Sequence, residues 1–348
     1  MTIKFGFCLP IFAWPGARLF RTPGFAQLNV PRCMELGVLA EQLGYHSLWV
    51  ADHLMLGQDE AILEGWTTLA ALAGMTHRTR LGIIHYNNVF RHPAFTAKMV
   101  ATLDQISGGR MIHFVDYGNN AREYLAYGMH EDAGDDVART VRIAQMAEGL
   151  ELTLALWQAD APVTWNGEHY LTHNAVCHPK PLQQPRPPIW MGEVWPELLK
   201  VAARHADAWN TTPVSVAELR RRLGLLKTVC DDIGRDVATM EKTLEIQVLI
   251  ALDHASLRQK LQTLLALIPS TETAAPDLLR YVNGETDALP DEMRETWLAG
   301  TPDEVRVRVQ AYVAEGITHF MLWFVDAPDD SGLRLFAQQV LPYFAHES

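Results

Sequence analysis

The chain has 348 residues, and its 29 Lys and Arg against 41 Asp and Glu give a formal charge of −12. So acidic a chain is a poor candidate for general binding of nucleic acids or anionic membranes, which both require a cationic surface. It holds no apolar run of about eighteen residues, so we expect no membrane-spanning helix. The four cysteines lie far apart without a C-x-x-C pair, which favours reduced thiols in the cytoplasm and predicts neither a disulfide framework nor a metal site.

Strand-like and helix-like segments alternate along the chain. Buried strands are expected at 3–9, 47–50, 80–85, 111–115, 188–192, 207–210, 243–251 and 318–324. Helices are expected at 31–43, 66–75, 94–106, 135–156, 215–233, 302–315 and 332–345, and another ends at His205. Eight such alternations predict an α/β fold, a single-domain (β/α)8 TIM barrel spanning 1–348. An open doubly wound sheet is the alternative, although no G-x-G-x-x-G sequence follows a strand.

Three stretches interrupt this alternation and are expected to be lid-like insertions. Segment 12–30 is long for a first strand–helix connection and is rich in aromatic side chains. It is predicted to be either a lid over the substrate mouth or a loop that packs on a neighbouring subunit. Segment 157–187 is rich in Pro, Gly and His, and Asn166-Gly167 predicts a small hairpin within it. Segment 267–300 has the composition of irregular chain and is the second candidate for a lid.

The carboxyl ends of the strands are where an α/β barrel carries its reactive groups. Asp52 and His53 follow the second strand, and they are either an acid–base pair or a structural pair that ties a loop. The loop Gly192-Glu193-Val194 opens a helix, whose backbone amides can hold a phosphate without any lysine. Aromatic side chains near the same ends suit a flat ligand, and those predicted to bind the substrate are Phe12, Trp14, Trp66, Phe90 and Trp323.

Several motifs occur together in an order that is typical of one family. They are Leu103-Asp104-Gln105-Ile106-Ser107-Gly108-Gly109-Arg110, then Glu123-Tyr124-x-x-Tyr127-Gly128, and later Pro187-Pro188-Ile189-Trp190-Met191-Gly192. The earlier Leu48-Trp49-Val50-Ala51-Asp52-His53 and the later Ala206-Asp207-Ala208-Trp209-Asn210 fit the same pattern. Over residues 3–210 the chain strongly resembles the bacterial-luciferase-like flavin-dependent oxidoreductases.

The resemblance implies a monooxygenase that uses reduced FMN and O2 to oxygenate a small organic substrate through a C4a-peroxyflavin. A separate flavin reductase would supply the reduced FMN. A related branch uses a deazaflavin coenzyme for hydride transfer, and this alternative stays open. His53 would be the catalytic residue, hydrogen-bonding or moving a proton near the ring. The residues that the resemblance places against the coenzyme are His85, Tyr86, Asn87, Asp116, Tyr117, Gly118, Tyr124, Gly192, Glu193 and Val194.

Two positions depart from the pattern of the family. The exit of the fourth strand reads Asp116-Tyr117-Gly118 without the arginine that is common there, and the phosphate loop carries Glu193 where a second glycine is usual. These departures motivate a third hypothesis, a non-catalytic flavin-binding barrel. The resemblance also implies a non-proline cis peptide bond at the exit of the third strand. We expect a homodimer or homotetramer in the cytoplasm, with neither nucleic acid nor membrane as a partner.

Overall fold

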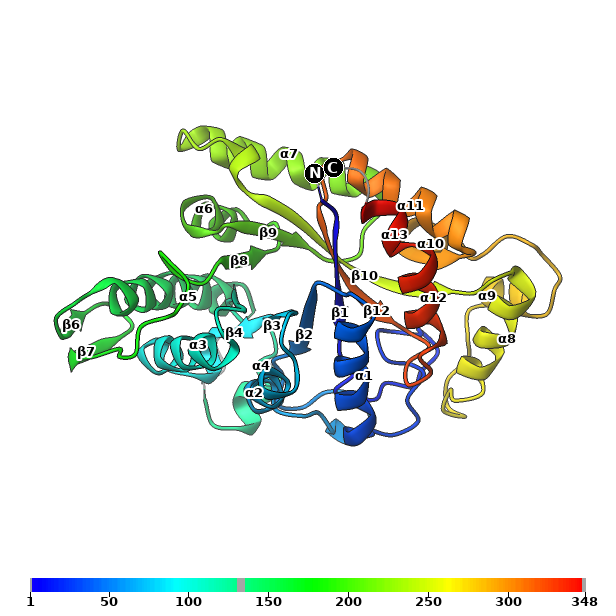
Figure 1. The fold of residues 1–348 in the computed structure, drawn as a ribbon, viewed down its shortest axis with the longest axis horizontal. Coiled ribbons are helices and arrows are strands. Elements are labelled where there is room, and N and C mark those ends of the chain that lie inside the picture. Colours follow the sequence, from blue (N-terminus) through cyan, green and yellow to red (C-terminus); the bar gives the residue numbers. More distant parts are fainter. Residues whose placement is uncertain (1, 130–134, 346–348) are drawn as a thin grey trace.

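The computed structural model describes residues 2–129 and 135–345, and its centre is a closed barrel of parallel strands (Figure 1). Going round the barrel, the strands are β1 (Lys4–Cys8), β2 (Ser47–Ala51), β3 (Arg80–Ile84), β5 (Met111–Asp116), β8 (Ile189–Gly192), β9 (Ala208–Thr211), β10 (Glu241–Ile250) and β12 (His319–Phe324). β12 pairs back onto β1, with Lys4 opposite His319. The predicted (β/α)8 TIM barrel is therefore confirmed, and the open-sheet alternative is wrong.

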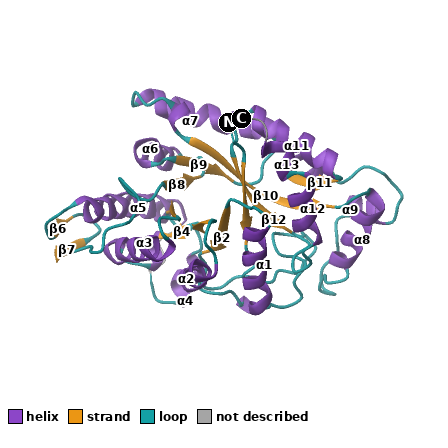
Figure 2. Ribbon diagram, in the orientation of Figure 1, coloured by secondary structure: helices purple, strands orange, loops and turns teal. Residues whose placement is uncertain are grey.

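The helices lie outside the barrel (Figure 2). They are α1 (Val30–Gln42), α2 (Gly65–Met75), α3 (Pro93–Ser107), α4 (Ala121–Ala126), α5 (Asp135–Gln158), α6 (Pro196–His205), α7 (Val216–Asp232), α8 (His254–Leu265), α11 (Pro302–Ala314), α12 (Ser331–Gln339) and α13 (Leu341–Ala345). Short 3-10 turns occupy Gln58–Glu60, Asn88–Phe90 and Val237–Thr239. The predicted single helix at 332–345 is in fact α12 and α13. Of the helices described, none is both long and apolar enough to cross a membrane.

The insertions at 157–187 and 267–300 lie on opposite sides of the barrel (Figure 1). Strands β6 (Val163–Asn166) and β7 (Leu171–Ala175) form the antiparallel hairpin predicted around Asn166-Gly167. The prediction of irregular chain at 267–300 is wrong in part, because this segment contains α9 (Pro276–Val282), α10 (Asp291–Thr296) and β11 (Trp297–Gly300). β11 extends the sheet by pairing with β10. Helices this short show no apolar period in the sequence and depend on tertiary packing for their stability.

The inside of the barrel is a packed core. Trp49 of β2 lies with its ring against those of Phe114 and Trp190, at centroid distances of 6.2 and 4.9 Å. Gly82 on the neighbouring strand makes room for it, because a Cβ at that position would lie 2.1 Å from a ring atom of Trp49. Large side chains in successive layers fill such a barrel. The space for a ligand therefore lies at the carboxyl ends of the strands, beyond this core.

A buried carboxylate fixes the first helices to the barrel. Glu41 of α1 accepts hydrogen bonds from the backbone amides of His77, Arg78 and Thr79, at 2.7 to 3.0 Å. Burial alone would raise the pKa of this carboxyl from 4.5, but the hydrogen bonds from Thr79, Arg78 and His77 outweigh it and lower the pKa to about 2.

Glu41→Gln is expected to lower the free energy of unfolding at neutral pH by about 2 kcal/mol, since hydrogen bonds to a charged acceptor are replaced by weaker ones. Because the folded pKa of Glu41 is depressed, its contribution is complete above the unfolded value of 4.5 and is lost as the pH falls towards 2. Urea unfolding of both proteins between pH 7 and about pH 3 checks this. A difference that stays constant with pH would contradict it.

Candidate active site

A polar cavity of about 110 Å³ lies at the mouth of the barrel. Its walls come from the ends of β2, β3, β5, β8 and β9 and from segment 12–30. The lining residues are Arg21, Asp52, His53, Ile84, His85, Asn87, Asp116, Gly118, Asn119, Glu193 and Thr212. The structure thus brings the predicted catalytic His53 together with five of the predicted coenzyme residues, namely His85, Asn87, Asp116, Gly118 and Glu193.

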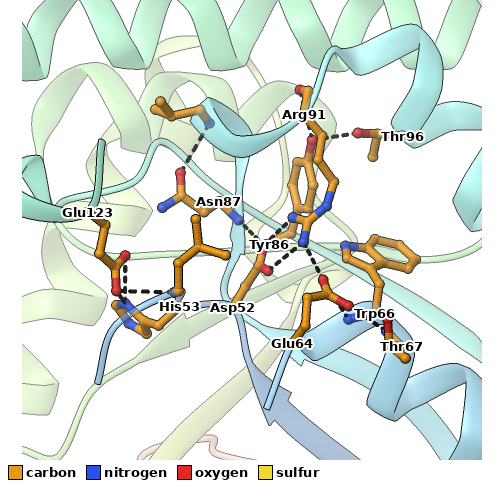
Figure 3. A network of polar contacts seen from close by, with 12 residues as sticks. Asp52, His53, Glu64, Trp66, Thr67, Tyr86, Asn87, Arg91, Thr96 and Glu123 are labelled. Carbon is orange, nitrogen blue, oxygen red and sulfur yellow. Dashed lines mark hydrogen bonds and ion pairs between the residues drawn. The ribbon is translucent and has the colours of Figure 1, made fainter. Parts of the chain in front are cut away.

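His53 is held by a buried carboxylate from α4 (Figure 3). Its Nδ1 donates to Glu123, whose two oxygens lie at 3.0 and 3.2 Å. The Glu123 side chain is fully buried and also accepts from the backbone amides of Leu54 and Met55. A carboxylate at Nδ1 fixes the ring orientation and keeps that nitrogen protonated. Within the described chain Nε2 has no hydrogen-bond partner, so it is the nitrogen available to a ligand in the cavity.

Asp52 does not pair with His53 but ties together the loops after β2 and β3. Its carboxylate accepts from Nη1 and Nη2 of Arg91 at 2.8 and 3.0 Å and from the backbone amide of Asn87 at 2.9 Å (Figure 3). Arg91 also donates to Glu64, at 2.7 Å. Burial raises the pKa of Asp52 above 3.8, although Arg91 opposes this. Asp52 thus joins two loops without His53, and the roles of the two residues stay predictions.

Arg91→Met is expected to destabilise the protein by about 3–5 kcal/mol at pH 8, because it leaves the Asp52 carboxylate buried without its cation. The loss should be smaller at pH 5, where Asp52, with its raised pKa, takes up a proton more readily. Chemical denaturation at both pH values measures it.

Arg122→Met is the matched control for this prediction. Arg122 pairs with Glu60 at 2.7 Å but is 68% exposed, and exposed pairs contribute about 0–1 kcal/mol. Equal losses in the two variants would show that the Asp52–Arg91 pair has no structural role.

A second group of acids and one histidine lies across the cavity from His53. His85 follows a cis peptide bond, Ile84–His85, which is at the strand-three exit where the resemblance implied one. Its Nδ1 is 3.4 Å from an Asp116 oxygen, and its Nε2 is 3.7 Å from Glu245 of β10. Burial, and then the charge of Asp116, raise the pKa of Glu193 above 4.5. The carboxyl of Glu193 can therefore hold a proton closer to neutral pH than an ordinary glutamate.

Glu245 and Arg21 were not among the predicted site residues, yet they form the inner wall of the mouth. The fully buried Glu245 forms an ion pair with Arg21, whose Nη2 lies at 2.8 Å, and accepts a hydrogen bond from Trp323 Nε1 at 2.6 Å. The guanidinium of Arg21 lies 5.1 Å from the centroid of the Trp323 ring. The signal in the sequence was an acidic residue between Leu244 and Ile246 of a predicted strand, because an acid that is buried there needs a partner.

The remaining predicted coenzyme residues lie around the cavity. Tyr124 Oη accepts from Asn87 Nδ2 at 3.1 Å, so it supports a lining residue. Tyr117 is buried at the exit of β5, and Gly192 ends β8, followed by the partly buried Val194. Tyr86 is turned away, with its hydroxyl 2.6 Å from that of Thr96. Their contacts with a coenzyme stay predictions.

The predicted substrate residues are more scattered. Phe12 and Trp323 are buried with ring centroids 5.9 Å apart, and Trp14 lies beside Phe12. Trp66 packs on Tyr86, and Phe90 packs on Tyr124. None of these five aromatic residues lines the cavity at the mouth, so their contact with a substrate also stays a prediction.

The mouth has the polar groups that a flat coenzyme with an anionic tail requires. Two buried side-chain atoms that lie close together, His85 Nε2 and Glu245 Oε2, have no hydrogen-bond partner within the described chain. Buried atoms of this kind normally have one, so they suit a polar ligand edge. The exit of β5 lacks the arginine that is common in the family, but α5 places two arginines nearby. Arg142 Nε donates to the Gly118 carbonyl at 3.1 Å, and the Arg139 guanidinium lies 4.1 Å from the centroid of the Trp195 ring. The polar groups at the mouth therefore have the chemistry that the coenzyme requires.

The side chain of Arg21 lies between two cavities at the mouth of the barrel. A cavity of about 110 Å³ is smaller than the roughly 300 Å³ of ordinary small-molecule pockets. Arg21 and Thr212 separate it from a second cavity of about 320 Å³, which both residues also line. A ligand with three rings occupies more than the inner cavity, so Arg21 is the side chain that its size affects most directly.

Comparison with known proteins identifies the family of this chain. The family model described as luciferase-like monooxygenase matches residues 3–319. A relative named F420-dependent glucose-6-phosphate dehydrogenase, from Amycolatopsis mediterranei, is 26% identical, and the match covers 89% of this chain and 93% of the relative.

Two solved structures are similar along almost the whole chain. An F420-dependent secondary alcohol dehydrogenase has a TM-score of 0.74 at 21% identity, covering 98% of each chain. The monooxygenase RslO1 from Streptomyces bottropensis has a TM-score of 0.73 at 24% identity, covering 99% of this chain and all of that one. At such identities these two structures support the fold. Because the family model covers nearly the whole chain, the protein belongs to the luciferase-like monooxygenase family of oxidoreductases.

Proposed function

We propose that this protein is a deazaflavin-dependent oxidoreductase that interconverts a secondary alcohol and its ketone with a coenzyme of the F420 type. One observation carries the proposal: the cavity contains a histidine whose Nδ1 is fixed by the buried Glu123 and whose Nε2 is available to a ligand. Similarity to the F420-dependent dehydrogenase from Amycolatopsis supports the choice of coenzyme. The deazaflavin, when bound, supplies a two-electron hydride acceptor or donor.

The proton chemistry belongs to the protein. In alcohol oxidation, His53 Nε2 takes the hydroxyl proton, and in ketone reduction the protonated ring returns it to the oxygen. Glu123 stabilises the positive charge that His53 then carries, as a buried carboxylate beside an imidazole does. The polar walls formed by Asn87, Asn119 and Thr212 can orient the substrate oxygen towards His53.

The coenzyme tail would be held on the other side of the mouth. The backbone amides of the turn before α6, at residues 193–195, lie at the positive end of the helix. Arg139 and Arg142 bring two cations to the same region. The side chain of Glu193 lines the inner cavity, where its pKa is raised, so it disfavours an anion there less than an ionised carboxylate would.

Oxygenation of a small substrate with reduced FMN and O2 is the second candidate. It is favoured by the aromatic side chains of segment 12–30, where Phe12 and Phe20 both pack edge-on against Trp14. Oxygen chemistry on a reduced flavin requires the exclusion of water, and a lid of apolar rings over the mouth would provide it. This candidate adds a separate flavin reductase as a partner. The reductase, the homodimer or homotetramer and the cytoplasmic location stay predictions from the sequence.

Parallel assays of the purified protein with each coenzyme distinguish these functions. Oxidised F420 is incubated with a panel of secondary alcohols without O2, while reduced FMN is mixed with the corresponding ketones in an oxygen electrode. The proposal predicts bleaching of F420 absorbance by some of the alcohols and no substrate-dependent O2 uptake. Substrate-dependent O2 uptake with FMN, and none of this bleaching, would contradict it and select oxygenation.

A further inference from the structure

Three cavities lie in sequence from the barrel mouth to the surface. The polar cavity at the mouth and the middle cavity of about 320 Å³ share Arg21 and Thr212 as lining residues. The middle cavity and an outer one of about 380 Å³ share Arg18, Glu292 and Trp297. Shared lining residues make the three cavities neighbours in a row, with Arg21 and Thr212 between the first two and with the outer two between segment 12–30 and the insertion at 267–300. We call this row of cavities the groove.

The chemistry of this groove changes with distance from His53. At the mouth nearly all lining side chains are polar or charged. In the middle, Arg18 and Arg21 lie with the aromatic Phe20 between them, since both guanidinium groups are about 5 Å from its ring centroid. The outer cavity is lined mainly by apolar side chains, among them Leu19 and Leu278. A ligand that fills the groove is therefore polar at its inner end and apolar at its outer end.

The groove walls are fixed to the barrel. Leu19 is 2% exposed and belongs to a second hydrophobic cluster that also contains Leu278, Met293 and Trp297. Next to it, the Arg21 backbone amide donates to Gln247 Oε1 of β10 at 2.7 Å, and the Arg21 side chain pairs with Glu245 on the same strand. The two insertions thus contact each other and the barrel, which makes the groove a built feature of the fold.

We infer that this groove binds the distal part of an elongated, amphipathic substrate. The reacting alcohol or ketone carbon lies by His53, a polar region passes Arg18 and Arg21, and an apolar chain or ring system lies against Leu278 and Trp297. This inference rests on the proposed function for the position of the reacting carbon. It makes the outer cavity the determinant of substrate length.

The inference predicts that longer ketones bind more tightly than shorter ones. Each methylene that leaves water for an apolar site tightens binding by up to about fourfold, until the groove is full. Calorimetric titration of the full-length protein with 2-alkanones, from butan-2-one to dodecan-2-one, measures this with and without F420. Wild-type protein is expected to show little gain for the methylenes that pass Arg18 and Arg21, then an affinity that rises over several successive methylenes in the outer cavity and reaches a plateau.

Variants that fill the outer cavity test where the alkyl chain of the ketone lies. Ala275 is exposed and lines this cavity, so Ala275→Trp should place the plateau at a shorter ketone and leave butan-2-one binding unchanged. Ala17→Trp, which fills the same cavity from segment 12–30, should have the same effect. It replaces Ala275→Trp if that variant has a much lower melting temperature than the wild type. Ala161→Trp, at an exposed alanine beside the β6–β7 hairpin, is the control and should keep the wild-type profile.

Failure of the groove and failure of the proposed function give different results. Affinities that do not depend on chain length, or a plateau unmoved in both Ala275→Trp and Ala17→Trp, would overturn the groove even if F420 is reduced normally. The wild-type length dependence with a shortened plateau in the variants supports the groove even if F420 is never reduced. That last result would reject the hydride-transfer proposal alone.

Discussion

His53→Ala is expected to lower kcat by about 10²–10⁴-fold, the usual contribution of a positioned acid–base group. The reason is geometric: Glu123 holds Nδ1 at 3.0 Å, and Nε2 is left for the substrate oxygen. Little loss of stability is expected, because the His53 side chain is 24% exposed and is not part of the hydrophobic core. Steady-state kinetics and a thermal melt of the same preparation measure the two effects.

The control for this variant is the partner carboxylate. Glu123→Gln keeps an oxygen that can accept from the amides of Leu54 and Met55, but it removes the charge that stabilises a protonated His53. It should therefore lower kcat less than His53→Ala does. Unchanged turnover in His53→Ala would contradict a catalytic role of His53. A melting temperature lowered by many degrees would mean that His53 has a structural role.

Gly118→Ala is expected to weaken coenzyme binding at least tenfold and to destabilise the protein by about 3 kcal/mol. Gly118 has φ of 79°, which costs about 1–2 kcal/mol for a residue with a side chain. The added Cβ would lie 2.2 Å from Tyr124 Oη and 2.3 Å from Asn87 Oδ1, so both groups must move. Because Asn87 lines the cavity, its displacement changes the site itself.

Gly128→Ala separates strain from steric contact. Gly128 has a similar φ of 66°, but a Cβ there would meet no atom of residues 2–129 or 135–345 within 4 Å. Gly128→Ala should lower the free energy of unfolding only by the cost of placing a side chain at positive φ, and it should leave coenzyme affinity unchanged. If denaturation and coenzyme titration gave the same losses for both glycines, the close contact at Gly118 would not contribute to the site.

Much of the fold could be predicted because its signals are local. Each barrel strand is a short buried run, and capping residues such as Asn29 before α1 and Thr301 before α11 mark where helices begin. The insertion at 267–300 was harder, since α9 and α10 have seven and six residues. Such helices are stabilised by the second hydrophobic cluster, which unites distant segments and leaves no periodic pattern in any one of them.

The sequence predicted where the site residues lie better than it predicted which side chains they bond to. The rule that barrel strands carry function at their carboxyl ends predicted His53 and Glu193, and the resemblance to the family added His85 and Asp116, which line the same cavity. It could not identify which carboxylate holds His53, because Glu123 is 70 residues later and on another element. Asp52 is adjacent in sequence, yet successive residues at a strand end point in opposite directions, and its partner is Arg91.

Equilibrium binding of the coenzyme tests whether the barrel mouth is a coenzyme site. F420 and FMN, each oxidised and reduced, are titrated against the full-length protein and followed by coenzyme fluorescence. The account predicts saturable binding of one F420 per chain, tighter than FMN, and weakened by Gly118→Ala but not by Gly128→Ala. Absence of saturable binding for both coenzymes in either redox state would contradict the assignment of the barrel mouth as a coenzyme site.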